Sequence, residues 1–130
     1  MTNSSAPTLP NMPEASVVCS NLVVLRGTVN ADVVERELPN GGVAVQFDVR
    51  TPTAPSTSVN VSWIDPPADA RAAILIGEQV VVIGTVQRRF FRVGGATQSR
   101  TEVVAAKVIP ARRARSVRSA IAAAARSLGD

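Results

Sequence analysis

Apolar and polar residues alternate most regularly in the stretch VAVQFDVR at 43–50, where every second residue is valine or phenylalanine. This period of two is typical of a strand with one buried face, and it places Phe47 in the core. The stretch SVNVSW at 58–63 repeats the pattern with Val59, Val61 and Trp63 on one side. Between the two, TPTAPST at 51–57 has the composition of a loop. The sequence therefore predicts two half-buried strands in succession.

Two longer β-rich stretches each contain a glycine. GEQVVVIGTVQRRFFR at 77–92 has Gly84 inside an apolar run, and the run at 16–30 contains Gly27. A glycine within a strand marks a bulge or a sharp bend, which lets a sheet curve and close. A return strand is expected at 32–38, before the turn PNGG, and a last strand at 99–109 after the pair Gly94–Gly95.

Two helices are expected outside the strands. Asp65 and Pro66 provide a cap and a first-turn proline for a short helix whose body is 68–76 and which ends at Gly77. A longer helix spans 112–128, with an apolar stripe at spacings of three and four made by Ala114, Val117, Ile121, Ala124 and Leu128. The stripe requires a partner surface, so we expect this helix to pack on the protein instead of acting as a free basic tail.

Together these elements predict a mainly β fold, an OB-fold five-stranded barrel with a short helix between strands 3 and 4 and an extra C-terminal α-helix. The expected organisation is a flexible tail at 1–15, rich in Pro, Ser, Thr and Asn, an OB-fold domain at 16–110, and a basic amphipathic helix at 111–130. A length of 130 residues is consistent with one such domain.

The charge distribution points to a polyanionic partner. The net charge is +4, but residues 1–87 are net acidic, whereas residues 88–130 carry nine Arg and one Lys against Glu102 and Asp130. Such an asymmetry favours a polyanion bound by the C-terminal part. The strand that ends in Arg88, Arg89, Phe90, Phe91 and Arg92 suits single-stranded nucleic acid, because rings stack on bases and guanidinium groups hold phosphates. The alternative is a long hairpin whose tip is simply basic.

Composition argues against an enzyme. The chain has no histidine and a single cysteine, so no Cys/His metal cluster can form, and neither a Walker nor a dinucleotide-binding glycine pattern is present. No catalytic residue, metal ligand or cofactor is expected. Cys19 is interpreted as a small buried apolar residue. No apolar run is long enough to span a membrane and no signal peptide is evident, so a cytoplasmic protein is expected.

These motifs, in this order, resemble the bacterial single-stranded DNA-binding protein (SSB) family. The resemblance covers roughly residues 20–109 and rests on NLVVLRGTV, RELPNGG, GEQVVVIGTVQRRFF and TEVVAAKV. It implies a non-enzymatic OB-fold protein that binds single strands by base stacking in replication, repair or recombination, usually as a tetramer. Single-stranded DNA is the implied partner, with RNA left open.

The resemblance also implies particular contact residues. Phe91 falls where the family has a stacking aromatic, and Arg89 and Gln87 share its face by strand alternation. Trp63 falls where the family has a second aromatic, whereas its alternation with Val59 and Val61 indicates the core, so both assignments stay open. Outside the resemblance, Arg112, Arg115 and Arg118 of the C-terminal helix are expected to extend the phosphate track, because docking of the apolar stripe would hold them near the barrel.

The sequence departs from the family pattern in three ways. The loop at 51–57 has no aromatic residue, the loop is short, and the chain ends in an Arg- and Ala-rich helix, without the usual flexible linker and acidic C-terminal tip. The chain is therefore interpreted as a specialised paralogue of the family. The alternative function is an OB-fold protein–protein interaction module, with the Arg-rich helix as its contact, and binding of labelled oligo(dT) distinguishes the two.

Overall fold

The computed structural model describes residues 20–30, 33–52 and 56–129. Along the chain the elements are β1 (Val23–Val29), β2 (Val34–Glu37), β3 (Val43–Thr51), β4 (Thr57–Ile64), α1 (Ala68–Ala72), β5 (Gln79–Val93), β6 (Ala96–Pro110) and α2 (Ala114–Gly129). The expected N-terminal tail, Cys19 and the centre of the loop at 51–57 lie outside the described residues. Neither described helix is long and apolar enough to cross a membrane.

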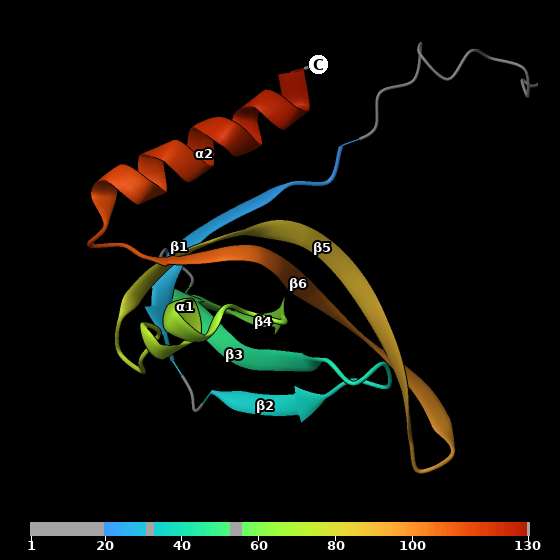
Figure 1. Ribbon diagram of the computed structural model, residues 1–130. Helices are drawn as coiled ribbons and strands as arrows, with labels where there is room; N and C mark the ends of the chain where they lie inside the picture. The colour runs from blue at the N-terminus through green and yellow to red at the C-terminus, as the bar shows by residue number, and fades with distance from the viewer. Residues whose placement is uncertain (1–19, 31–32, 53–55, 130) are drawn as a thin grey trace, which may run out of the picture.

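Five of the strands close into a ring (Figure 1). The sheet order is β1-β5-β6-β4-β3-β2, and β1 also pairs with β3 at the other side of the ring. All neighbours are antiparallel except β4 and β6, which are parallel, and α1 lies in the connection from β4 to β5. The expected mainly β fold is confirmed, with one difference. The predicted return strand at 32–38 is the short β2, which adds to the edge of β3, so the sheet has six strands.

The two glycines that the sequence singled out lie where backbones approach most closely. A β-carbon on Gly27 would lie 2.4 Å from the carbonyl oxygen of Arg50, at the point where β1 passes from β5 to β3. A β-carbon on Gly84 would lie 2.0 Å from the carbonyl oxygen of Val104. Both separations are too short for any side chain, so glycine is required for the strands to close the ring.

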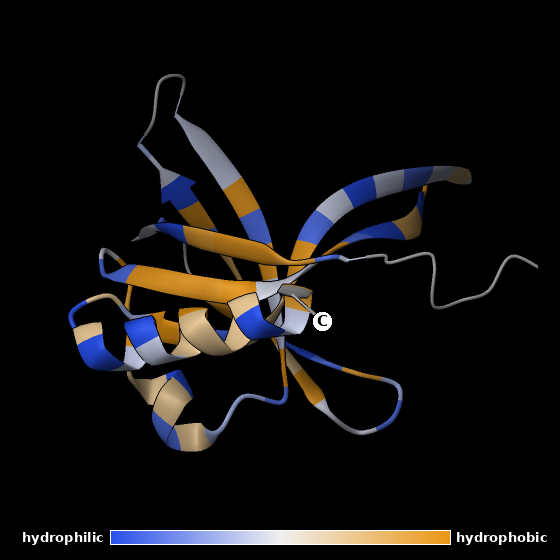
Figure 2. Cartoon of the chain, turned by 90° about the horizontal axis from the view of Figure 1, so that it is seen from above, coloured by the Kyte–Doolittle hydropathy of each residue, from blue (hydrophilic) through white to orange (hydrophobic). Residues whose placement is uncertain are grey.

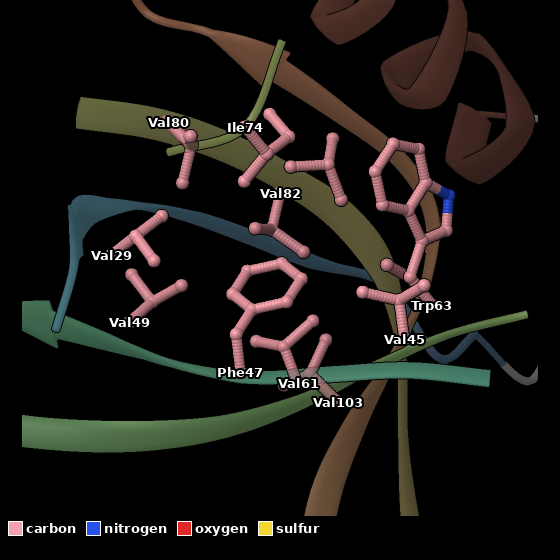
Figure 3. Packing of buried hydrophobic residues seen from close by; sticks show 12 residues of the cluster. Val29, Val45, Phe47, Val49, Val61, Trp63, Ile74, Val80, Val82 and Val103 are labelled. Carbon is pink, nitrogen blue, oxygen red and sulfur yellow. The ribbon is translucent and has the colours of Figure 1, made fainter. Parts of the chain in front are cut away.

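Valine side chains fill the interior of the ring around two aromatic rings (Figure 3). Phe47 and Trp63 are each 3% exposed, and both lie in the same cluster as Val45, Val61 and Val82. Phe47 is therefore a core residue, as its alternation predicted. Trp63 points into the same core from β4.

A bulge changes the alternation of β6 halfway along the strand. Ile83 pairs with Lys107 and Gly84 pairs with Ala105, so Ala106 has no partner in the ladder. The residues of β6 that face the core are therefore odd-numbered before the bulge, as with Val103 and Ala105, and even-numbered after it, as with Val108. This change explains why the sequence pattern in this strand is weak.

Helix α2 lies against the outer face of the sheet, across its most hydrophobic strands (Figure 2). Val117 and Ala120 of α2 are each 7% exposed and pack with Val81 and Ile83 of β5. These β5 residues alternate with the valines that point into the ring, so β5 is apolar on both faces. Docking of the helix is as expected from the sequence.

The docked face of α2 differs from the predicted stripe. Ala120 occupies the contact, whereas Ile121 is 38% exposed and Leu128 also remains exposed. The docked face is made by Val117, Ala120 and Ala124. Ile121 lies about 100° further around the helix from Ala120, away from this contact.

The start of α1 also differs from the prediction. The helix begins after Pro67 without a side-chain cap, and the carboxylate of Asp65 instead accepts a hydrogen bond of 2.8 Å from the backbone N–H of Val43. Asp65 adopts a positive φ of 46°, which turns the chain out of β4. The hydrogen bond between Asp65 and Val43 ties the turn before α1 to the start of β3. The two residues are distant in the sequence, so the local pattern around Asp65 does not predict this contact.

Candidate nucleic-acid interface

The β5–β6 hairpin extends well beyond the ring (Figure 1). Each of its strands has 15 residues, and from residue 85 onward β5 is in register with β6 alone. The turn is made by Gly94 and Gly95, both with positive φ. We refer to residues 87–92 and 97–102 as the ribbon. No other strand of the described sheet pairs with it, and all of its residues except the buried Glu102 are exposed or partly exposed.

One face of the ribbon carries a cluster of cationic and aromatic side chains. The register places Gln87 opposite Glu102, Arg89 opposite Arg100, and Phe91 opposite Gln98. Directly opposed residues in an antiparallel pair point to the same side, so these six residues share what we call the Phe91 face. The sequence prediction that Gln87, Arg89 and Phe91 share a face is consistent with this register.

Two guanidinium groups flank the ring of Phe91. The Cζ atoms of Arg89 and Arg100 lie 6.0 Å and 5.7 Å from the ring centroid. Both distances are at the outer limit of a cation–π contact, and at exposed sites such a contact contributes only about 0.5–1 kcal/mol. Stacking of a base on an aromatic ring contributes about 1–3 kcal/mol. A base can therefore displace a guanidinium group from Phe91 and leave the cation free for a phosphate.

Glu102 is the only acidic residue of the ribbon. It is 6% exposed, and its Oε1 atom lies 4.0 Å from Nη1 of Arg89 with no hydrogen-bond partner among the described residues. The carboxylate is thus a buried counter-charge beneath Arg89. The Arg89 guanidinium therefore lies between this carboxylate and the ring of Phe91.

The opposite face of the ribbon carries Arg88, Phe90 and Arg92. Phe90 is 65% exposed, so it is a surface residue and not a packing residue. Nη2 of Arg92 donates a hydrogen bond of 2.8 Å to the carbonyl oxygen of Gly95, which braces the turn. This face presents a second aromatic surface between two cations.

The structure corrects the assignment of Trp63 as a stacking residue. Its ring lies inside the ring of strands and is covered on all sides by the core. The alternation of apolar and polar residues in β4 placed Trp63 correctly in the core, because this alternation reflects which face of the strand is buried. The aromatic surface is therefore restricted to the hairpin.

The three arginines predicted on the C-terminal helix lie in different surroundings. Arg112 is bound to Glu78 by an ion pair of 2.5 Å, at the end of the ring far from the hairpin turn. Arg115 lines a hollow between α2 and β6, together with Arg113 and Lys107. Arg118 is exposed and outside that lining.

Sequence reasoning missed Arg100, Lys107 and Arg113. Arg100 could have been found by counting outward from the Gly94–Gly95 turn, since a two-residue turn places residue 100 opposite residue 89. Lys107 and Arg113 have no such local signal, because the bulge and the docking of α2 bring them together. Among the described residues, no group of three or more His, Cys, Asp or Glu could hold a metal ion.

Comparison with known structures supports the same fold. The chain is similar to the SSB of Plasmodium falciparum in its complex with single-stranded DNA, with a TM-score of 0.60 and 16% sequence identity over 72% of this chain and 96% of that one. No family model matches the sequence, and neither does any curated protein. At this level of identity the likeness concerns the fold, which is OB-like.

Proposed function

We propose that this protein binds single-stranded DNA without sequence specificity, through the ribbon of an OB barrel. The observation that carries the proposal is the cluster of Arg89, Phe91 and Arg100 on an exposed hairpin. It is supported by the similarity of the fold to that of a protein solved with single-stranded DNA. In this proposal the protein acts in DNA replication, repair or recombination, in the cytoplasm with the nucleoid, and single-stranded RNA is a second possible ligand of the same chemistry.

Each ribbon residue has a distinct role in this mechanism. Phe91 stacks on a base, Arg89 and Arg100 move from the ring to the adjacent phosphates, and Gln87 offers an amide to the backbone or to a base edge. On the opposite face, Phe90 provides a second aromatic surface beside Arg88 and Arg92. Base stacking and phosphate contacts do not distinguish one base from another, so binding does not depend on sequence.

Single strands are preferred over duplex because stacking requires an unpaired base. In a duplex both faces of each base are already stacked, and only the phosphates remain for the arginines. A protein that used the arginines alone would show no such preference. A preference for single strands over duplex would therefore indicate stacking on Phe91 and not only attraction to the net positive charge.

We expect affinity for oligo(dT) to fall steeply with salt concentration. Each phosphate contact on a single strand contributes about −0.7 to the slope of log K against log [salt]. The measurement is fluorescence anisotropy of labelled oligo(dT) at several salt concentrations, with a duplex of equal length as control. An affinity that does not respond to salt, or a preference for the duplex, would contradict the proposal and favour a protein-binding OB module.

The protein is expected to assemble as a homotetramer. With Phe47 and Trp63 buried, each chain has only Phe90 and Phe91 to offer to bases. Tight binding then requires several copies on one strand, since linked sites bind far more strongly than single ones. Light scattering at micromolar concentration, with and without oligonucleotide, measures the mass. A monomer under both conditions would disprove this expectation.

A further inference from the structure

A furrow runs between α2 and the outer face of the sheet. Its basic part has a volume of about 500 Å³ and is lined by Lys107, Arg113, Arg115, Ser116 and Ser119. An adjoining part of about 330 Å³ is mostly apolar and is lined by Leu22, Ile83, Thr85 and Ala124. Lys107 and Ala120 line both parts, so the two hollows adjoin each other along α2, and we refer to them together as the furrow.

Among the described residues, the cations of the basic part have no acidic partner. The ion pairs within the described chain join Arg71 to Glu35, Arg89 to Glu102, and Arg112 to Glu78. None of them involves Lys107, Arg113 or Arg115, and no acidic residue lines the furrow. Three uncompensated cations beside two serine hydroxyls form a site for an anion with several oxygen atoms.

The furrow lies on the same side of the sheet as the Phe91 face. Ile83 pairs with Lys107 and packs against α2, so both point outward. Thr85, Gln87, Arg89 and Phe91 follow Ile83 at every second position of β5, and the alternation of β5 is not interrupted beyond residue 84. The surface that begins at Phe91 therefore continues through Thr85 into the furrow.

We propose that the furrow holds the phosphate backbone of the same single strand whose base stacks on Phe91. This inference rests on the proposed function and extends it. Helix α2 forms a wall of the binding path, with Lys107, Arg113 and Arg115 on the phosphates and the apolar part against sugars and base faces. Arg112, which is neutralised by Glu78, and Arg118, outside the lining, are not part of this path.

The test is the double variant Arg113→Gln/Arg115→Gln, measured on oligo(dT) of about 20 nucleotides, longer than the usual site of about 4–16 nucleotides of one OB fold. Loss of two phosphate contacts should reduce the salt slope by about 1.4 and the affinity several-fold. Lys107→Gln, which changes the strand and not the helix, should reduce the slope by about 0.7. The melting temperature of each variant shows whether the fold is retained.

The matched control is Arg118→Gln, compared with Arg115→Gln. Both remove one arginine from α2, three residues apart, so a general effect of net charge would change both slopes equally. The inference would be overturned if Arg115→Gln and Arg118→Gln gave equal salt slopes. It would also be overturned if the double variant and Lys107→Gln kept the salt slope of the unaltered protein. Either result would leave the ribbon as the binding site. If the unaltered protein does not bind oligo(dT), the proposed function fails first, and the inference fails with it.

Discussion

Replacing Trp63 with alanine is expected to lower the free energy of unfolding by about 3–5 kcal/mol, the usual range for removing a large aromatic side chain from a core. Trp63 packs with Phe47, Val45 and Val61 inside the ring, and the surrounding strands cannot collapse into the space because their backbones are paired (Figure 3). Domains are stable by only about 5–15 kcal/mol, so this loss is a large share. Chemical denaturation monitored by circular dichroism measures it.

The same prediction has a spectroscopic control. Trp63 is the only tryptophan of the chain, so intrinsic tryptophan emission reports on this site alone. Because the ring is buried, addition of oligo(dT) should leave its emission nearly unchanged. A Trp63→Ala variant that keeps its stability and loses binding, or strong quenching on addition of oligonucleotide, would show that the ring contacts nucleic acid after all.

The fold was largely predictable because a strand with one buried face has apolar and polar residues in alternation along the sequence. The alternation at 43–50 identified β3 and placed Phe47 inside, and the glycines at 27 and 84 identified the two close approaches that close the ring. What remained hidden depends on contacts between distant residues. Asp65 turns toward Val43 instead of capping a helix, and the bulge at Ala106 reverses the alternation of β6.

The site was predictable only along a single strand. Alternation gave Gln87, Arg89 and Phe91 on one face, because these residues are neighbours in the same strand. Arg100 required the pairing across the hairpin, and Arg113 required the position of α2 on the sheet. The Arg-rich helix looked uniform in sequence, but its docking face separates arginines that line the furrow from those that do not.

Replacing Phe91 with alanine is expected to weaken binding of oligo(dT) by about 1–3 kcal/mol, the usual contribution of one base stack. This corresponds to a loss of affinity of about fivefold to more than a hundredfold. The melting temperature should stay close to that of the unaltered protein, because the ring is only half-buried and its cationic neighbours are the partly exposed Arg89 and the exposed Arg100. The salt slope should change little, since no phosphate contact is removed.

Phe90→Ala is the matched control for the two faces of the ribbon. It removes the same side chain from the adjacent position, and Phe90 lies on the face opposite Phe91, away from the pair of arginines that flank that ring. If the strand follows the Phe91 face, Phe90→Ala should cost clearly less affinity than Phe91→Ala in the same anisotropy measurement. A larger loss in Phe90→Ala would place the strand on the other face of the ribbon. Since only the Phe91 face continues into the furrow under α2, such a result would also separate the ribbon from the helix.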